Sequence, residues 1–524
     1  MKISENWLRT WVNPAIDSDK LSDQLTMLGL EVDELAPAAK AFTGVVVGEV
    51  LTVEQHPDAD RLRVTTVNIG TAEPLQIVCG APNVRAGMKA PVATIGAVLP
   101  GDFKIKKGKL RGIESQGMLC GASEIDLEDK IDGLLELPDD AAVGVNIREY
   151  LDLDDNVIDI SITPNRGDCF SIRGIAREIG VINQLPVTAP EIKEVTATIA
   201  DEKQVVVSTE GCPRYLGRVI KNVNTKAATP VWMERALARS GIRQHSILVD
   251  ITNYVLMELG QPLHAFDAAK VQGAVHVRQA IADEKLVLLN EQEVELSDNV
   301  MVIADDEKAL AIAGIMGGLS SAVSDATTEI FLESAFFAPL HIAGRARSFG
   351  LHTDASQRYE RGVDFELPLI AMHRASQLIS ELAGGEFGPI TVAEKAELLP
   401  KRDAIELNQA QVDQLLGYKV ESDFITDALT RLGCTVTVKA EGEWSVVPPS
   451  HRYDMAIYQD LIEEVARIHG YDNIQISLPV IDVKLAKYQD QFELGQLRQT
   501  AVTLGYQEAI SFSFADWKLE KQLN

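Results

Sequence analysis

The stretch TGVVVGEVLTV, Thr43–Val53, begins a region rich in β-forming residues. Three more short β-rich runs follow it, over 62–69, 75–78 and 90–95, and Gly, Pro and Asn residues separate them. Short strands at regular spacing with turn residues between them are typical of a small barrel. The sequence therefore predicts a β-barrel over residues 40–150.

Helical patterns lie on both sides of this predicted barrel. Before it, leucines recur at helical spacing between a capping Ser18 and a terminating Gly29. After it, apolar residues recur at the same spacing over 172–182. We therefore expect the barrel to be inserted into an N-terminal α/β domain made of residues 1–39 and 151–190.

Residues 212–400 are predicted to form a large α+β domain. Pro230 starts one helical pattern, and two others cover 248–255 and 367–382. Residues 401–476 are predicted to form a smaller domain, in which two helices, a β-hairpin and a last helix resemble a winged-helix arrangement. The fold class expected for the whole chain is multidomain α+β.

The last part of the chain is expected to hold less structure. Residues 491–524 are predicted to begin with a helix and to continue with a strand over 509–514. No internal repeat of 20–50 residues is found in the sequence.

Length, charge and cysteine content exclude several classes of protein. A chain of 524 residues is too long for one hydrophobic core, so about three to five domains are expected. The net charge of −28 argues against indiscriminate binding to nucleic acid or anionic membranes. No apolar stretch is long enough to span a membrane, and Glu5 argues against an export signal. Five widely spaced cysteines without a C-x-x-C pair predict a reducing, cytoplasmic location.

A short basic segment stands out in this acidic chain. On a barrel, with Phe103 available for stacking, its side chains would suit an RNA backbone and an exposed base. A simple solvated hairpin is the alternative interpretation. The basic residues are Lys104, Lys106, Lys107, Lys109 and Arg111.

Four carboxylates form a second candidate site: Asp454, Asp460, Glu463 and Glu464. The last three are expected to share one helical face, where like charges repel by a few tenths of a kcal/mol per pair. A hard divalent cation such as Mg²⁺ would neutralise them. The alternative is that Arg467 forms a surface ion pair with Glu463 and that water solvates the other carboxylates.

Polar residues between 260 and 356 form a third candidate site. His264 lies in a predicted turn, although a lone histidine is more often structural. Apolar residues flank Glu333, so burial would make its carboxylate a selective acceptor. The flexible backbone of Gly314–Gly318 either approaches a ligand or turns a tight corner. The sequence contains no motif for a nucleophilic serine, a zincin or a P-loop.

Taken together, these segments closely resemble the family of bacterial phenylalanyl-tRNA synthetase β subunits. The resemblance runs in order along the whole chain and does not depend on one motif. Its most specific stretches are Trp7–Arg9, Leu28–Val32, His56–Leu62, Ile77–Asn83, Thr163–Arg166, Gly260–Asp267 and Asp460–Arg467.

The resemblance implies a domain order. An OB-fold tRNA-binding domain would be inserted into the first domain, and a B3/B4 editing domain that hydrolyses mischarged Tyr-tRNA(Phe) would follow. A winged-helix-like B5 domain and, from residue 477, the start of a catalytic-like domain would come last. Family members continue through that domain to an anticodon-binding domain, so the chain is expected to be a C-terminally truncated fragment.

The resemblance also implies roles for the residues of an editing pocket. Glu333 would recognise the tyrosyl hydroxyl, and Gly317 and Ala355 would leave room for the ring. Thr353 and His264 would orient the ester or the attacking water.

Cofactors and partners follow from the same resemblance. Asp454, Asp460, Glu463 and Glu464 would hold Mg²⁺ at a site shared with the α subunit. ATP would bind to that α subunit, which activates phenylalanine, and the complex would hold two α and two β chains. Its other partner would be tRNA(Phe), in the cytoplasm and away from any membrane.

Two other functions compete with editing. The first is a non-enzymatic scaffold that binds tRNA and supports assembly, with residues 212–400 merely presenting a surface. The second is an Mg²⁺-dependent hydrolase centred on Asp460 and Glu463. Mutation of these acids would abolish hydrolysis in the second case, whereas the family resemblance predicts mainly weaker assembly with the α subunit.

Overall fold

The computed structural model describes residues 1–127, 133–474, 476 and 493–523. It divides into two compact units, 1–474 and 475–524. The described residues of the second unit form two helices, α14 (Leu494–Thr503) and α15 (Trp517–Leu523). Residues 509–514 are not a strand, so that prediction is wrong, since a strand needs a neighbour to pair with and the described part of this unit has none. The predicted helix start at Gln491 lies outside the described residues.

The N-terminal sheet is built from two distant segments of the chain. Strand β11 (Asn156–Ser161) lies between β1 (Lys2–Ser4) and β2 (Glu31–Pro37) and is antiparallel to both. The helices of this region are α1 (Glu5–Trp11), α2 (Ser18–Met27) and α4 (Ile172–Asn183).

Polar side chains cap two helices of this region. Ser171 caps α4 by accepting a hydrogen bond from Gly174 N. Asp17, not the predicted Ser18, caps α2, because its carboxylate accepts from Lys20 N.

Between the two segments lies a six-stranded sheet with its own two apolar clusters. Its order is β10-β6-β3-β4-β5, and β7 pairs with β6. The four β-rich runs of the sequence correspond to β3–β6, so those predictions are confirmed. The bounds are β3 (Thr43–Gln55), β4 (Arg63–Asn68), β5 (Leu75–Cys79), β6 (Lys89–Leu99), β7 (Phe103–Lys104) and β10 (Gly117–Leu119), with the hairpin β8 (Gly108–Leu110) and β9 (Ile113–Ser115) and the short helix α3 (Ile147–Tyr150) beside them.

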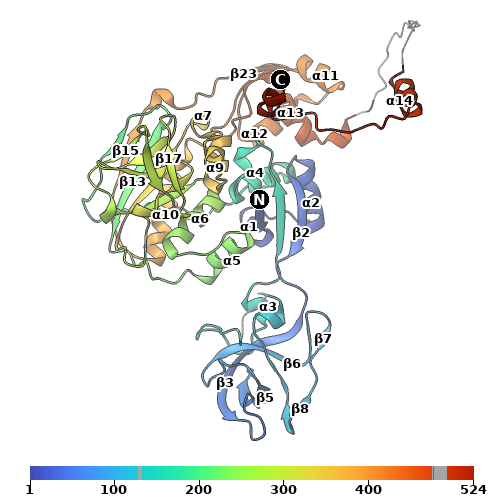
Figure 1. Cartoon of the computed structure of the whole chain (residues 1–524), viewed down its shortest axis with the longest axis vertical. Helices are drawn as coiled ribbons and strands as arrows, with labels where there is room; N and C mark the ends of the chain where they lie inside the picture. Colours follow the sequence, from blue (N-terminus) through green and yellow to red (C-terminus); the bar gives the residue numbers. More distant parts are fainter. Residues whose placement is uncertain (128–132, 475, 477–492, 524) are drawn as a thin grey trace. The chain divides into compact units, whose positions relative to one another are not determined.

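The middle region contains two larger sheets and the helices that cover them (Figure 1). The four-stranded sheet has the order β14-β21-β13-β22, and helices α6 and α10 pack against it. Its strands and helices are β13 (Arg214–Lys221), β14 (Leu263–Asp267), β21 (Glu329–Phe336), β22 (Glu386–Glu394), α5 (Val231–Arg239), α6 (Ile247–Leu259) and α10 (Leu367–Leu382).

The second sheet of this region has five strands in the order β12-β15-β18-β19-β20. A hairpin and three short helices complete the region. The bounds are β12 (Val205–Val207), β15 (Val275–Gln279), β16 (Glu284–Val287), β17 (Glu293–Leu296), β18 (Met301–Ala304), β19 (Ala309–Ile312), β20 (Met316–Gly317), α7 (Pro339–Ile342), α8 (Arg345–Ser348) and α9 (Asp354–Arg361).

Residues 405–469 contain the helices and the hairpin that the sequence predicts. A three-stranded sheet has the order β23-β25-β24. The bounds are β23 (Ile405–Asn408), α11 (Gln409–Leu416), α12 (Ser422–Arg431), β24 (Thr435–Ala440), β25 (Glu443–Val447) and α13 (Tyr458–His469). One apolar core runs through this region, the N-terminal sheet and α6 and α10, so these parts pack together.

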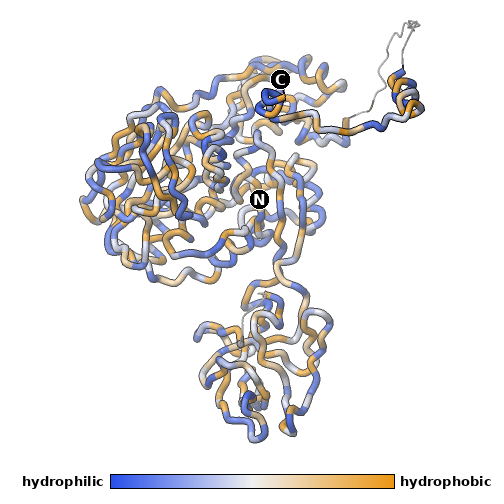
Figure 2. Tube along the Cα trace, viewed as in Figure 1, coloured by the Kyte–Doolittle hydropathy of each residue, from blue (hydrophilic) through white to orange (hydrophobic). Residues whose placement is uncertain are grey.

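Hydrophobic and hydrophilic stretches alternate along the chain (Figure 2). Among the described residues, every helix is too short or too polar to cross a bilayer. All five cysteines are free and buried.

Candidate functional site

Strand register brings two of the predicted site residues together. His264 on β14 pairs directly with Glu333 on β21, and Gly217 on β13 lies opposite Glu333 on its other side. Directly opposed residues of antiparallel strands point to the same face of a sheet. The imidazole and the carboxylate therefore lie next to each other, and the glycine adds no side chain between the strands.

This face of the sheet borders a cavity of about 80 Å³. The cavity wall also includes the segment from β19 to β20 and the start of α9. Four of the five predicted editing residues line the cavity: His264, Gly317, Glu333 and Ala355. Most other lining groups are apolar, as expected for a pocket that accepts an aromatic ring.

Glu333 is the buried carboxylate of this cavity. Its side chain is 7% exposed, and its Oε2 accepts a hydrogen bond of 2.8 Å from the hydroxyl of Tyr215. Among the described residues, no hydrogen bond reaches Oε1, so this oxygen is available to a ligand. Burial raises the pKa of Glu333 to about 7, although the Tyr215 hydrogen bond acts in the opposite direction.

His264 also has an unused polar atom at the cavity. Its Nε2 is buried, and no described residue forms a hydrogen bond with it. Burial lowers the pKa of His264 to about 4, so the ring is neutral near pH 7. The ring lies against Gly317, where an added Cβ would lie 2.8 Å from Nε2. Gly317 is therefore a close-approach position, which the sequence left open as one of two interpretations.

Thr353 does not line the cavity. Its hydroxyl donates to the carbonyl of Ile315 at 2.9 Å and accepts from Ser356 N at 3.1 Å, which caps α9. This side chain thus holds a cavity-wall carbonyl and the helix that carries Ala355. An orienting role toward an ester remains a prediction from the family resemblance.

Sequence reasoning missed the two buried tyrosines of this site. Tyr215 bonds to Glu333, and the Tyr359 hydroxyl donates to the carbonyl of Ala335 at 2.9 Å. Neither tyrosine has a sequence signal, because each lies within an ordinary strand or helix pattern. A larger cavity of about 490 Å³, lined in part by Trp7, Trp232 and Tyr254, contains none of the predicted residues.

The five predicted tRNA-binding residues are all exposed on the inserted β-region, and Phe103 beside them is 59% exposed. Lys107 forms an ion pair of 2.7 Å with Glu114, which lowers the pKa of that carboxyl. The other four have no ion-pair partner among the described residues: Lys104, Lys106, Lys109 and Arg111. This exposure is compatible with binding to a phosphate backbone.

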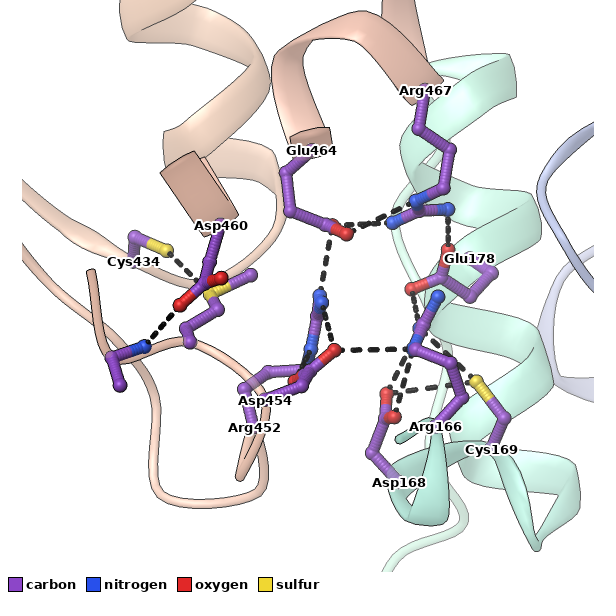
Figure 3. A network of polar contacts seen from close by, with 12 residues as sticks. Arg166, Asp168, Cys169, Glu178, Cys434, Arg452, Asp454, Asp460, Glu464 and Arg467 are labelled. Atoms are coloured by element: carbon purple, nitrogen blue, oxygen red, sulfur yellow. Dashed lines mark hydrogen bonds and ion pairs between the residues drawn. The ribbon is translucent and has the colours of Figure 1, made fainter. Parts of the chain in front are cut away.

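Two of the four predicted Mg²⁺ ligands, Asp454 and Glu464, lie instead in a network of ion pairs (Figure 3). Arg452 binds both oxygens of Asp454, at 2.8 and 2.9 Å, and donates to Glu464 at 2.9 Å. Arg467 joins Glu464 to Glu178 on α4. Burial alone would raise the pKa of Glu464, but these two arginines hold it well below its usual range.

Residues 460, 463 and 464 lie on α13 at the spacing of one helical face, but their surroundings differ. Glu464 is buried, whereas Glu463 is exposed. Asp460 lies apart from the network in Figure 3 and caps α13 by accepting from Ala456 N and Ile457 N. The alternative, a surface pair between Glu463 and Arg467, is wrong, because Arg467 is buried against other carboxylates.

These four carboxylates do not fit a single metal site in this arrangement. Among the described residues, they do not form a group with the spacing of metal ligands. A guanidinium already neutralises Asp454 and Glu464, which removes the electrostatic reason for a cation there. One group does have such spacing, Asp168, Cys169 and Glu178, but Arg166 donates to all three.

Three family models match this chain. A tRNA binding domain matches residues 45–146, a B3/4 domain matches 211–384, and a tRNA synthetase B5 domain matches 405–471. The phenylalanine–tRNA ligase beta subunit of Acinetobacter baylyi is 81% identical over all 524 residues. The chain belongs to the phenylalanine–tRNA ligase beta subunit family. The beta subunit of Psychrobacter arcticus is 58% identical over 532 aligned residues, again across the whole chain.

The chain covers 66% of the length of each of these two beta subunits. A solved N-terminal fragment of the phenylalanyl-tRNA synthetase beta-subunit from Pyrococcus horikoshii is a more distant match. It has a TM-score of 0.37 and 11% identity, and the alignment covers 90% of this chain and 99% of the fragment.

Proposed function

We propose that this chain is the part of a phenylalanine–tRNA ligase beta subunit that binds tRNA(Phe) and hydrolyses mischarged Tyr-tRNA(Phe). One observation supports the editing activity most directly. A carboxylate, Glu333, borders a cavity lined mainly by apolar groups, and one of its oxygens has no described partner. The range that matches the B3/4 domain, residues 211–384, contains the residues that line this cavity.

Editing is needed because an apolar pocket rejects an added hydroxyl only weakly, by about 100-fold. In the proposed site the tyrosyl hydroxyl donates to Oε1 of Glu333. Phenylalanine would cover this oxygen without giving it a hydrogen-bond donor, at a cost of about 1–3 kcal/mol. The site therefore selects the wrong amino acid for hydrolysis.

Hydrolysis in this proposal uses a water molecule directly. No cavity residue is assigned as a covalent nucleophile, and a ribose hydroxyl of the tRNA could assist the attack. His264, neutral and with Nε2 unpaired, is suited to orient the ester or the water. Gly317 and Ala355 leave room for the ring, while Thr353 fixes the wall that carries them.

The proposed domains follow the predicted order. Residues 40–150 would be an OB-fold, a proposal supported by the hydrogen bond from Gln116 N to Gln76 O, which joins the two ends of the six-stranded sheet. Residues 1–39 with 151–190 would form the N-terminal domain, and 212–400 the editing domain. Residues 401–476 would be winged-helix-like, and 477–524 would begin a catalytic-like domain.

The partners are proposed from the family. The chain would assemble with an α subunit, two copies of each, in the cytoplasm, and the α subunit would bind ATP and charge tRNA(Phe). Mg²⁺ would serve the complex as a whole. Because Asp454 and Glu464 are bound to Arg452, no step is assigned to an ion on this chain.

A deacylation assay tests this function. Preformed Tyr-tRNA(Phe) and Phe-tRNA(Phe) are each incubated with the chain alone and with the chain mixed with α subunit. We expect the mixture to clear Tyr-tRNA(Phe) faster than Phe-tRNA(Phe) and an E333A variant to lose the difference. Binding without turnover would instead indicate the scaffold. Loss of turnover on mutation of Asp460 or Glu463, but not of Glu333, would indicate the Mg²⁺-dependent hydrolase.

A further inference from the structure

We propose that Tyr215 is a positioning residue for substrate selection, because its hydroxyl occupies Oε2 of Glu333 and leaves Oε1 as the acceptor for the ligand. This inference rests on the proposed editing function and adds a residue to it. The Tyr215 side chain is fully buried and its hydroxyl lies 2.8 Å from Oε2. It does not itself line the cavity, so it acts on the substrate through Glu333.

Strand register explains how this tyrosine reaches the carboxylate. Tyr215 pairs with Ala335, two residues from Glu333 along β21. Both tyrosine and glutamate therefore point to the same face as diagonal neighbours, about 7–8 Å apart at the backbone, a separation that long side chains can span. Gly217, directly opposite Glu333, has no side chain to block this path.

The fixed contact restricts what Glu333 can do. A free carboxylate has two equivalent oxygens and can rotate, so either oxygen could accept a hydrogen bond and in several directions. Because the Tyr215 hydroxyl fixes Oε2, the carboxylate cannot rotate and Oε1 keeps one orientation. A fixed acceptor of this kind is what preorganised recognition requires. A phenol can donate to Oε1, whereas a phenyl ring cannot.

Among the residues that the structure describes, no charged group competes for Glu333. The titratable groups around it are Tyr215 on β13, Cys212 just before that strand, His264 on β14 and Tyr359 on α9. Burial raises the pKa of Cys212, Tyr215 and Tyr359 well above their usual values and lowers that of His264 to about 4. All four are therefore neutral near pH 7.

A consequence follows for the dependence of editing on pH. Among the described residues, the Tyr215 hydrogen bond is the interaction that lowers the pKa of Glu333 against the effect of burial. Its removal should raise this pKa further, so that the carboxyl is protonated at neutral pH and is no longer a charged, strong acceptor. Hydrolysis that needs the ionised carboxylate would then require a higher pH.

The test measures Tyr-tRNA(Phe) hydrolysis between pH 6 and 8.5 with the chain assembled with its α subunit. We expect Y215F to lower the rate at pH 7 about tenfold, the loss expected for one hydrogen bond to a charged group. The acid limb of the profile should move up by about one pH unit, and activity should recover toward pH 8.5. The rate of E333Q should not fall at acid pH in this way. Adding Y215F to E333Q should cause no further shift of the pH profile.

The matched control is Y359F. It removes a buried hydroxyl from the same cavity, but this hydroxyl bonds to Ala335 O and not to Glu333. We expect the acid limb of Y359F to keep its parental midpoint, whatever its rate. A Y215F profile with the parental midpoint, or one lowered equally at every pH, would overturn the positioning role. If E333Q also kept the parental profile and discrimination, the editing proposal itself would be wrong.

Discussion

Gly317 lies so close to His264 that a Cβ on the glycine would be 2.5 Å from Cε1 of the imidazole. We expect G317A to displace the ring and to lower Tyr-tRNA(Phe) hydrolysis by about 100-fold, as misplacement of a site group by about 1 Å can do. G495A is a suitable control, because no heavy atom lies within 4 Å of its Cβ position. Deacylation kinetics of both variants check this, and a parental rate for G317A would remove His264 from the proposed chemistry.

Ala355 provides a second test of the cavity. Its small side chain lines a space of about 80 Å³, which an indole would fill. We expect A355W to stop clearance of Tyr-tRNA(Phe) while aminoacylation by the complex continues at the parental rate. The measurement is the accumulation of Tyr-tRNA(Phe) during charging, with A355G as the control. Accumulation no greater than with the parent would place the editing pocket elsewhere.

Burial of Glu333 should make stability depend on pH. Its pKa is about 7 in the folded chain and near 4.5 when unfolded, so the folded state retains the proton to a higher pH. Ionisation of Glu333 therefore costs no stability below pH 4.5, and the cost grows between pH 4.5 and pH 7. Above pH 7 the full cost is about 3 kcal/mol. We expect E333Q to raise Tm relative to the parent at pH 8 but not at pH 4.5. The same Tm difference at both pH values would contradict this prediction.

Arg452 should stabilise the junction between α13 and the N-terminal region. Removing one partner of a buried ion network leaves uncompensated charge, so R452M should lower the free energy of unfolding by about 3–5 kcal/mol. K439A breaks an exposed pair with Glu406 and should leave the free energy of unfolding nearly unchanged. Urea unfolding at pH 7 measures both.

The contribution of Arg452 also depends on pH. Glu464 has a folded pKa below its unfolded one, so the stabilisation is present above the unfolded pKa and is lost as the pH falls. The penalty of R452M should therefore shrink in acid. A penalty that stays constant as the pH falls from 4.5 toward 2 would show that Arg452 acts through packing alone.

Substitutions in the exposed basic segment should weaken tRNA binding to different extents. Each lost phosphate contact should lower the slope of log affinity against log salt by about 1. We expect K109A to weaken binding more than K107A, because Lys107 is already paired with Glu114. Filter binding at several salt concentrations tests this, with K285A as a control outside the inserted β-region. Equal slopes for K109A and K285A would count against this surface.

Much of the fold could be predicted from local patterns. The runs that became β3–β6 and the helix at 367–382 needed only side-chain periodicity and turn residues. The strand expected over 509–514 failed because a strand depends on a partner that local sequence does not reveal.

The candidate site was only partly predictable. His264 and Glu333 were proposed separately, but their pairing across two strands depends on register between distant segments. Tyr215 remained unnoticed for the same reason. The sequence did not reveal the ion pairs of the carboxylates near residue 460. Their partners Arg452 and Arg467, and the link to Glu178 on α4, depend on tertiary packing.

The N-terminal sheet has a consequence for how this chain folds during synthesis. Strand β1 is made before β11, the strand that pairs with it among the described residues, which follows more than 150 residues later. At about 5–20 residues per second, the ribosome needs about 8–30 s to synthesise that partner. The inserted β-region is contiguous in sequence, and its synthesis is finished within that interval. It can therefore fold on the nascent chain before β1 has a strand to pair with.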